Sequence, residues 1–269
     1  MKKLLAILLC LSLILALAAC SKPESQTQQP AEQPAQTENQ PTEPTQAEQP
    51  SEPEALTYPI EQFTVGTTAA IETATFGEYN FDMLASGVSE LPLVWQDAEG
   101  NYHPLLASYE TADSVTWVYT IEPGMSWSDG EPVTAEDILF TLEYDDANGS
   151  ANFVSQTDED GKTTEAKYAS YELSSDAMSI SLTLSSANVR ELSNMTSFRV
   201  MPKHIYEGKD SVTEIDARVT CGPYMLESFN KEAGTLTFVP NPYYPQEPNV
   251  GKIVYRLFGN EDTMYLALQ

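Results

Sequence analysis

VTWVYTIEPGMSWSDGEPVTAEDILFTLE, residues 115–143, predicts a strand, a turn and a helix in direct succession. Apolar side chains occupy every second position at its start, which is typical of a strand with one buried face. These side chains are Val115, Trp117, Tyr119 and Ile121. Trp127 then anchors a turn that closes at Gly130, where glycine can adopt the positive φ that other residues avoid. We therefore expect a β-turn-α unit near the middle of the chain.

The first turn of the predicted helix carries its own capping residues. Thr134 can cap the helix, and Asp137 can accept a hydrogen bond from the Thr134 amide, as in a capping box. Glu136 places negative charge where the helix dipole is positive. The apolar stripe that follows consists of Ala135, Ile138, Leu139 and Leu142. Turn formation and capping account for Asp129, Glu136 and Asp137, so we do not assign them to glycosidase acid/base chemistry.

Length and charge narrow the possible partners. The chain has 269 residues, enough for one large or two ordinary domains, and its formal net charge is -27. Clusters of Lys and Arg that could neutralise phosphates are absent from the sequence, so no nucleic-acid partner is expected. The negative field would favour a cationic or zwitterionic ligand, although solubility explains the same charge more simply.

Residues 1–20 have the anatomy of a secretory signal peptide. Lys2 and Lys3 precede an apolar run that is too short for a permanent transmembrane helix, and residues 17–20 read L-A-A-C. This ending resembles a bacterial lipobox, which implies that Cys20 is lipidated and becomes the mature N-terminus, anchored in a bilayer by its acyl chains. Cys10 leaves with the signal, so Cys221 is the only thiol of the folded part and no intrachain disulfide is expected.

Residues 21–56 predict a disordered tether. They consist almost wholly of Gln, Pro, Glu, Thr, Ala and Ser and contain no aromatic residue. A flexible coil of this length would span roughly 30–36 Å, and its prolines and like charges should extend it. We expect the tether to lift the folded part through the cell-wall layer.

From Thr57 onward the composition is that of a globular domain. Strands are expected at residues 63–65, 178–185, 236–239 and 252–258, with a loop at 66–68, and helical stretches before Leu91 and over 189–195. Residues 158–161, D-E-D-G, do not fit a calcium loop, because the loop spacing would place Gln156 and Lys167 at its first and last ligands. We interpret them as a solvated turn.

Several segments resemble one family. WSDGEPVTAEDILF, residues 127–140, resembles the signature of family 5 of the extracellular solute-binding proteins, the oligopeptide, dipeptide and nickel type that serves ABC importers. Four more segments follow the family pattern in order: PLLASYE at 104–110, PKH at 202–204, TCGPY at 220–224 and NPYY at 241–244. Two departures stand out. Glu122 replaces a usual basic residue, and Glu90-Leu91-Pro92-Leu93 replaces a usual Tyr-Glu-Gly-Leu.

The resemblance implies an α/β fold of the type II periplasmic-binding-protein class, here incomplete because the second lobe is missing. Residues 57–90 and 196–269 would form part of the first lobe, and residues 91–195 the small second domain of the family. Residues 260–263 predict a helix start, but only residues 264–269 remain, which is too few for a stable helix. We therefore expect a truncated, N-terminal half of a longer protein.

The resemblance also implies a function, namely binding of a peptide or other small solute and its delivery to the transmembrane subunits of an ABC permease. Carried over by position, the ligand-facing residues are Glu78, Tyr79, Asn80, Cys221, Gly222 and Tyr224. Glu78 would receive a ligand amino terminus, and Gly222 would allow close backbone approach. An inert buried thiol is the alternative for Cys221, and core packing the alternative for Tyr224.

An enzyme is not expected. The sequence holds no Gly-x-Ser-x-Gly elbow, His-Glu-x-x-His, phosphate loop or paired Cys motif, so we predict no catalytic residue, no metal site and no cofactor. The expected protein is a monomeric lipoprotein on the extracytoplasmic face of a bacterial membrane, of the Gram-positive type. A surface receptor or adhesin that senses peptides without transport is the alternative.

Overall fold

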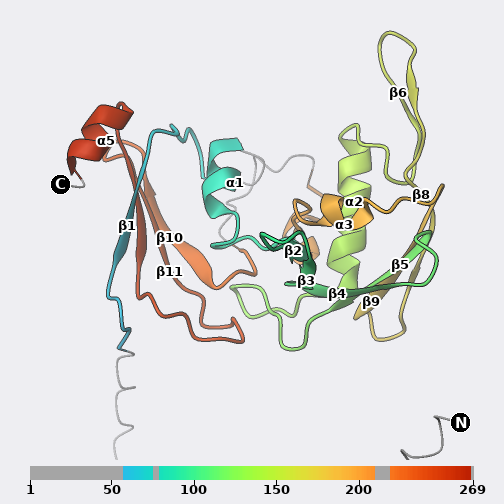
Figure 1. Ribbon diagram of the computed structural model, residues 1–269, viewed down its shortest axis with the longest axis horizontal. Helices are drawn as coiled ribbons and strands as arrows, with labels where there is room; N and C mark the ends of the chain where they lie inside the picture. Colours follow the sequence, from blue (N-terminus) through green and yellow to red (C-terminus); the bar gives the residue numbers. More distant parts are fainter. Residues whose placement is uncertain (1–56, 75–78, 210–218, 268–269) are drawn as a thin grey trace, which may run out of the picture. The chain divides into compact units, whose positions relative to one another are not determined.

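The computed structural model describes residues 57–74, 79–209 and 219–267. The chain divides into two compact units, residues 1–53 and 54–269. The first unit, with the predicted signal, Cys20 and most of the tether, lies outside the described residues. The fold below is therefore that of the second unit, which is mixed α/β (Figure 1).

One antiparallel sheet has the strand order β4-β5-β9-β8. Its strands are β4 (Ala107–Thr111), β5 (Thr116–Ile121), β8 (Tyr168–Leu173) and β9 (Ser179–Leu184). β5 pairs Trp117 with Leu182 and Tyr119 with Ile180 of β9, so the buried positions of both strands share one face. Helix α2 (Ala135–Ala147) packs on this sheet (Figure 1). The predicted strand-turn-helix unit is thus confirmed.

Short elements surround this sheet. They are the hairpins β2 (Val94–Gln96) with β3 (Tyr102–Pro104) and β6 (Gln156–Thr157) with β7 (Thr163–Thr164), and the helices α3 (Glu191–Met195) and α4 (Lys203–Tyr206). The turn between β6 and β7 is closed by Asp158, whose carboxylate accepts hydrogen bonds from the amides of Asp160 and Lys162.

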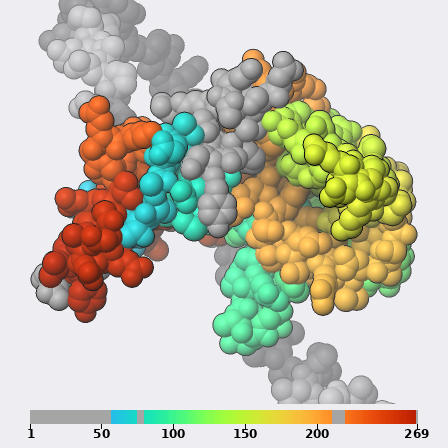
Figure 2. All heavy atoms as spheres, turned by 90° about the horizontal axis from the view of Figure 1, so that it is seen from above, coloured from blue at the N-terminus to red at the C-terminus, as the bar shows by residue number. Residues whose placement is uncertain are grey.

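A second sheet has the order β1-β12-β11-β10. Its strands are β1 (Phe63–Thr67), β10 (Tyr224–Asn230), β11 (Thr235–Pro240) and β12 (Ile253–Leu257). β1 pairs in parallel with β12, and the other neighbours are antiparallel. In Figure 2 the red C-terminal atoms accordingly lie beside the blue-cyan atoms of β1.

Two hydrophobic cores follow from these sheets. The first, which we call the α2 core, lies between α2 and the β5–β9 face and includes Trp127, Tyr119 and Leu182. The second, the α1 core, joins helix α1 (Tyr79–Ala85) to the second sheet and consists of Phe81, Ala85, Tyr224, Leu226, Leu236 and Phe238. Val200 and Cys221 pack in the α2 core. The division into a first lobe and a second domain stays a prediction.

One prediction about the C-terminal residues is wrong. Residues 261–267 do form a helix, α5 (Glu261–Ala267). The side chain of Asn260 caps it by accepting the amide hydrogen of Thr263 at 2.9 Å, and Met264 packs on Gly66 of β1. These two contacts stabilise a helix that length alone would not. Within the described ranges, no helix combines the length and apolar character needed to cross a bilayer.

Candidate functional site

The corner formed by residues 127–141 is organised by Asp137, which is 4% exposed. One carboxylate oxygen accepts hydrogen bonds from the amide of Thr134 at 2.8 Å and from the indole N–H of Trp127 at 3.4 Å. The other accepts the amide of Lys203 at 2.8 Å. Burial raises the pKa of Asp137, and these hydrogen bonds oppose the shift. The hydroxyl of Thr134 donates to the carboxylate as well, so Asp137 is an acceptor for four donors and is a structural group.

The surface of the same corner makes two side-chain contacts with α4. His204 Nε2 lies 2.8 Å from Asp129 Oδ2, and Lys203 Nζ lies 2.8 Å from Glu136 Oε2. Gly130 closes the turn with φ of +94°, as its position in the sequence predicts. Asp129 and Glu136 therefore each have a partner from α4.

Residues 85–92 and 219–224, which we call the junction, run side by side where the α1 core meets the α2 core. The amide of Gly222 donates to the carbonyl of Ser89 at 2.8 Å, and the amide of Tyr224 donates to that of Val88 at 3.1 Å. A Cβ at position 222 would lie 2.6 Å from the Ser89 carbonyl atoms. The close backbone approach predicted at Gly222 is therefore made by Ser89 of the same chain.

The predicted ligand residues fall into two groups. Glu78 lies outside the described residues, and Tyr79 begins α1. The side-chain amide of Asn80 donates a hydrogen bond to the Ala70 carbonyl at 2.6 Å. Cys221, Gly222 and Tyr224 lie at the junction, where Tyr224 starts β10 and is 8% exposed in the α1 core. Because Phe81 of α1 packs in that same core, the structure brings α1 and the start of β10 together.

Cys221 is a buried thiol. It is 2% exposed, and burial raises its pKa to about 12. A thiol with such a pKa stays protonated at neutral pH and is a poor nucleophile. Its side chain packs in the α2 core as an inert buried thiol would, and a ligand contact by Cys221 stays a prediction.

The junction also contains Glu90, which sequence reasoning did not select. Its side chain is 4% exposed and lies 3.4 Å from Nε of Arg199. Burial, followed by the charge of Asp82, raises the pKa of Glu90 to about 8, and Arg199 opposes the shift. The only sequence signal was the departure from the family pattern at residues 90–93.

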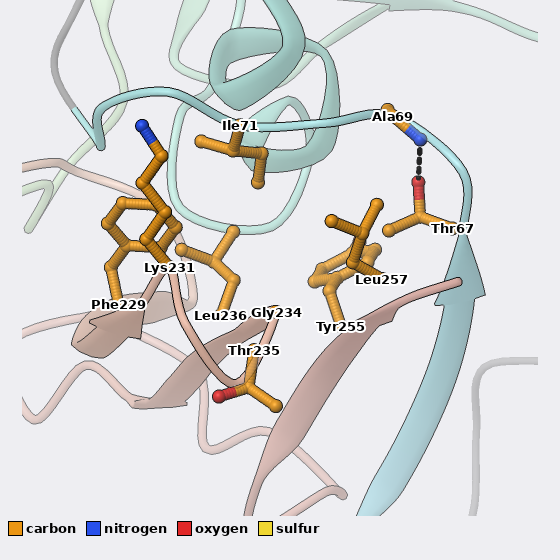
Figure 3. Close-up of a pocket in the computed structure, with 10 residues that line it drawn as sticks. All are labelled: Thr67, Ala69, Ile71, Phe229, Lys231, Gly234, Thr235, Leu236, Tyr255 and Leu257. Carbon is orange, nitrogen blue, oxygen red and sulfur yellow. Dashed lines mark hydrogen bonds between the residues drawn. The ribbon is translucent and has the colours of Figure 1, made fainter. Parts of the chain in front are cut away.

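A small apolar pocket of about 20 Å³ lies over the second sheet (Figure 3). Ile71, Leu236, Tyr255 and Leu257 line it, and Lys231 stands at its side. Lys231 is already paired with Glu72. Of the predicted ligand residues that the structure describes, none lines this pocket. Within the described ranges, moreover, no group of three or more His, Cys, Asp or Glu side chains is placed to hold a metal ion.

Comparison with known proteins identifies the family. The profile of the bacterial extracellular solute-binding proteins, family 5 (middle), matches residues 101–269, more than half of the chain. This chain belongs to family 5 of the bacterial extracellular solute-binding proteins. The corner and the junction segment 219–224 both lie within the matched range, so the resemblance expected from residues 127–140 and 220–224 is confirmed.

Individual relatives agree with the family 5 assignment. A probable ABC transporter-binding protein of Deinococcus radiodurans is 25% identical over 207 residues, which cover 67% of this chain and 33% of the relative. The nickel-binding periplasmic protein of Escherichia coli is 26% identical over 196 residues, which cover 70% of this chain and 35% of the relative. Both are binding proteins by description.

Solved structures of the family show the fold. The periplasmic oligopeptide-binding protein of Thermotoga maritima, determined with mannohexaose bound, superposes with a TM-score of 0.64 at 21% identity, over 78% of this chain and 40% of that one. The described residues thus have the fold of part of a type II periplasmic binding protein. This family 5 chain spans about a third of the length of its curated relatives.

Proposed function

We propose that the full-length protein captures a small solute outside the cell, a peptide or a molecule of similar polarity, and delivers it to the transmembrane subunits of an ABC permease. The family match over residues 101–269 is the observation that carries this proposal. The relatives supply the range of solutes, since their descriptions name nickel and oligopeptides, and one was solved with a bound sugar.

Within this function ligand contact remains our proposal for all six residues, Glu78, Tyr79, Asn80, Cys221, Gly222 and Tyr224. We add a supporting role for the last three. Support for the second role comes from contacts that these residues already make. Both backbone groups of Gly222 are occupied, because its amide donates to Ser89 and its carbonyl accepts from the Asn241 side chain at 2.9 Å. The buried side chains of Cys221 and Tyr224 then hold the junction in place.

The proposal includes the lipid anchor and the surface location. The L-A-A-C sequence ending at Cys20 supports lipidation, and the tether at residues 21–56 supports display beyond the membrane. Labelled palmitate should enter the wild-type protein and a Cys10→Ser variant but not a Cys20→Ser variant. Equal labelling of the two variants would remove the anchor from the proposal.

Transport is tested by uptake in the bacterium that encodes the protein. Deletion of the gene should abolish uptake of labelled peptides of two to nine residues, and reintroduction of the full-length gene should restore it. If labelled peptides bind the purified full-length protein but uptake is unchanged by the deletion, the protein is a peptide receptor and not an importer component. Uptake of nickel, measured in the same strains, distinguishes the two ligand classes of the relatives.

A further inference from the structure

The junction holds a buried carboxyl group that the proposed solute binding does not use. Glu90 lies in the turn between α1 and β2, and Arg199 lies in the segment between α3 and α4. Pro92 and Arg199 pair as an isolated antiparallel bridge, so these two chain segments lie side by side. The carboxyl group thus sits where the chain passes between the two hydrophobic cores.

The Arg199 side chain lies close to the Glu90 carboxyl group but donates no hydrogen bond to it. Nε of Arg199 is 3.4 Å from Oε2 of Glu90, yet Nε and both carboxyl oxygens lack a hydrogen-bond partner in the part of the chain that the structure describes. Nη2 of Arg199 donates instead to Ser86 Oγ at 2.6 Å. A buried carboxylate that accepts no hydrogen bond is far more costly than a buried neutral acid. The packed geometry therefore suits the protonated form of Glu90.

The ionisable groups around Glu90 act in opposite directions. Asp82, on α1, disfavours a second negative charge, and Arg199 favours it. Cys221, from the facing segment, contributes no charge because its own thiol is protonated. Burial is the largest influence, and the pKa of Glu90 is raised from 4.5 to about 8.

The turn that carries Glu90 is held by backbone hydrogen bonds that cross the junction. Ser89 and Val88 accept the amides of Gly222 and Tyr224, at 2.8 and 3.1 Å. Ser89 Oγ and Thr220 Oγ1, one on each side, are buried and without hydrogen-bond partners among the described residues. Water that enters to hydrate a charged Glu90 would find these hydroxyls and would separate the two segments.

We propose that Glu90 is a proton-operated latch of the junction. With its proton bound, the carboxyl group stays buried and residues 85–92 remain docked on residues 219–224. Loss of the proton leaves a carboxylate that needs water, and the turn detaches from the facing segment. The inference depends on the junction alone and not on the identity of the solute.

Hydrogen exchange of the Gly222 and Tyr224 amides tests the latch. The proton is held more tightly in the docked state than in the detached state, where the pKa returns to about 4.5, so detachment becomes easier as pH rises between these values. The opening equilibrium of both amides, corrected for intrinsic exchange, should rise by about tenfold per pH unit between about pH 6 and 7.5.

Two matched variants complete the experiment. Glu90→Gln keeps the shape of the side chain but cannot ionise, so the corrected exchange of both amides should be independent of pH. Glu99→Gln removes an exposed carboxylate and should keep the wild-type slope. The proposal is overturned if the opening equilibrium of the two amides does not rise with pH in the wild-type protein. It is also overturned if that equilibrium rises with pH in the Glu90→Gln variant. Carbon-13 titration of the Glu90 carboxyl is a second test. A midpoint near 4.5 in the folded protein would also overturn the proposal.

Discussion

The Asp137 carboxylate accepts a hydrogen bond from the backbone amide of Lys203, 66 residues further along the chain, at 2.8 Å. A second contact from α2 reaches the same segment, since Thr141 Oγ1 accepts the Met201 amide at 2.9 Å. Two residues of α2 thereby hold residues 201–203 in place. The corner at residues 127–141, which carries the family signature, has a structural role. Its Asp137 connects distant segments by accepting hydrogen bonds.

Removal of the Asp137 carboxylate should destabilise the protein strongly. Asp137→Ala leaves the amides of Thr134 and Lys203 without an acceptor inside the protein, and each buried unpaired donor costs about 1–3 kcal/mol. We expect a loss of about 3 kcal/mol in the free energy of unfolding, measured by urea denaturation. Glu136→Ala, one residue earlier, breaks only a partly exposed ion pair with Lys203 and should cost at most about 1 kcal/mol. Similar losses in the two variants would contradict the role of Asp137.

An added methyl group at Gly222 should be poorly tolerated. In Gly222→Ala the new Cβ would lie 2.6 Å from backbone atoms of Ser89, which cannot rotate away as a side chain could. We expect a destabilisation of about 1–3 kcal/mol by thermal or urea unfolding. Gly259→Ala is the control, because a Cβ there meets nothing within 4 Å. Equal stability of the two variants would show that the junction is not tightly packed.

The pKa of Asp97 should depend on His103. Hydrogen bonds from the His103 ring, then from Asn101, lower the pKa of Asp97 to about 2. An acid with a lowered pKa contributes stability that is complete above its unfolded pKa of 3.8 and is lost as pH falls toward 2. His103→Phe keeps a ring stacked on Trp95 but removes the donor, so the Asp97 midpoint should move toward 3.8 in a carbon-13 titration.

Asp113 serves as the internal control for that titration. Its pKa is lowered by the backbone amides of Thr116 and Val115, which the His103 substitution does not touch. The Asp113 midpoint should therefore stay where it is in wild type. An Asp97 midpoint that remains near 2 in His103→Phe would assign the shift to Asn101 instead.

The thiol of Cys221 should be inert in the folded protein. Burial keeps it protonated and out of reach of reagents, so in a Cys10→Ser, Cys20→Ser background a disulfide reagent should react more than about a hundred times slower than with free cysteine. Addition of guanidinium chloride should restore the full rate. Fast reaction without denaturant would place Cys221 at an accessible surface.

The sequence predicts those elements whose signal is local. β5 and β9 follow from alternation over six residues each, and α2 follows from the capping pair of Thr134 and Asp137. The second role of Asp137 depends on a residue 66 positions away, which no local pattern encodes. α5 was underestimated because its contact with Gly66 of β1 is likewise remote in sequence.

The junction shows the same limit for the candidate site. Gly222 suggested a close backbone approach, but the sequence could not reveal that the approaching group is Ser89 of the same chain. Glu90 looks like one more carboxylate of an acidic protein until Pro92 and Arg199 are paired in space. Burial of a charged residue arises from contacts between distant segments, and periodicity carries no information about these.

Native mass spectrometry of the full-length protein, purified without denaturation from its own bacterium, tests the central claim most directly. The account predicts that a fraction of the protein carries one small solute, a peptide or similar molecule, released on gentle unfolding and identifiable by its mass. A protein that carries no solute and also fails to bind any member of a mixed peptide library would contradict the assignment, as would cleavage of the peptides that it binds.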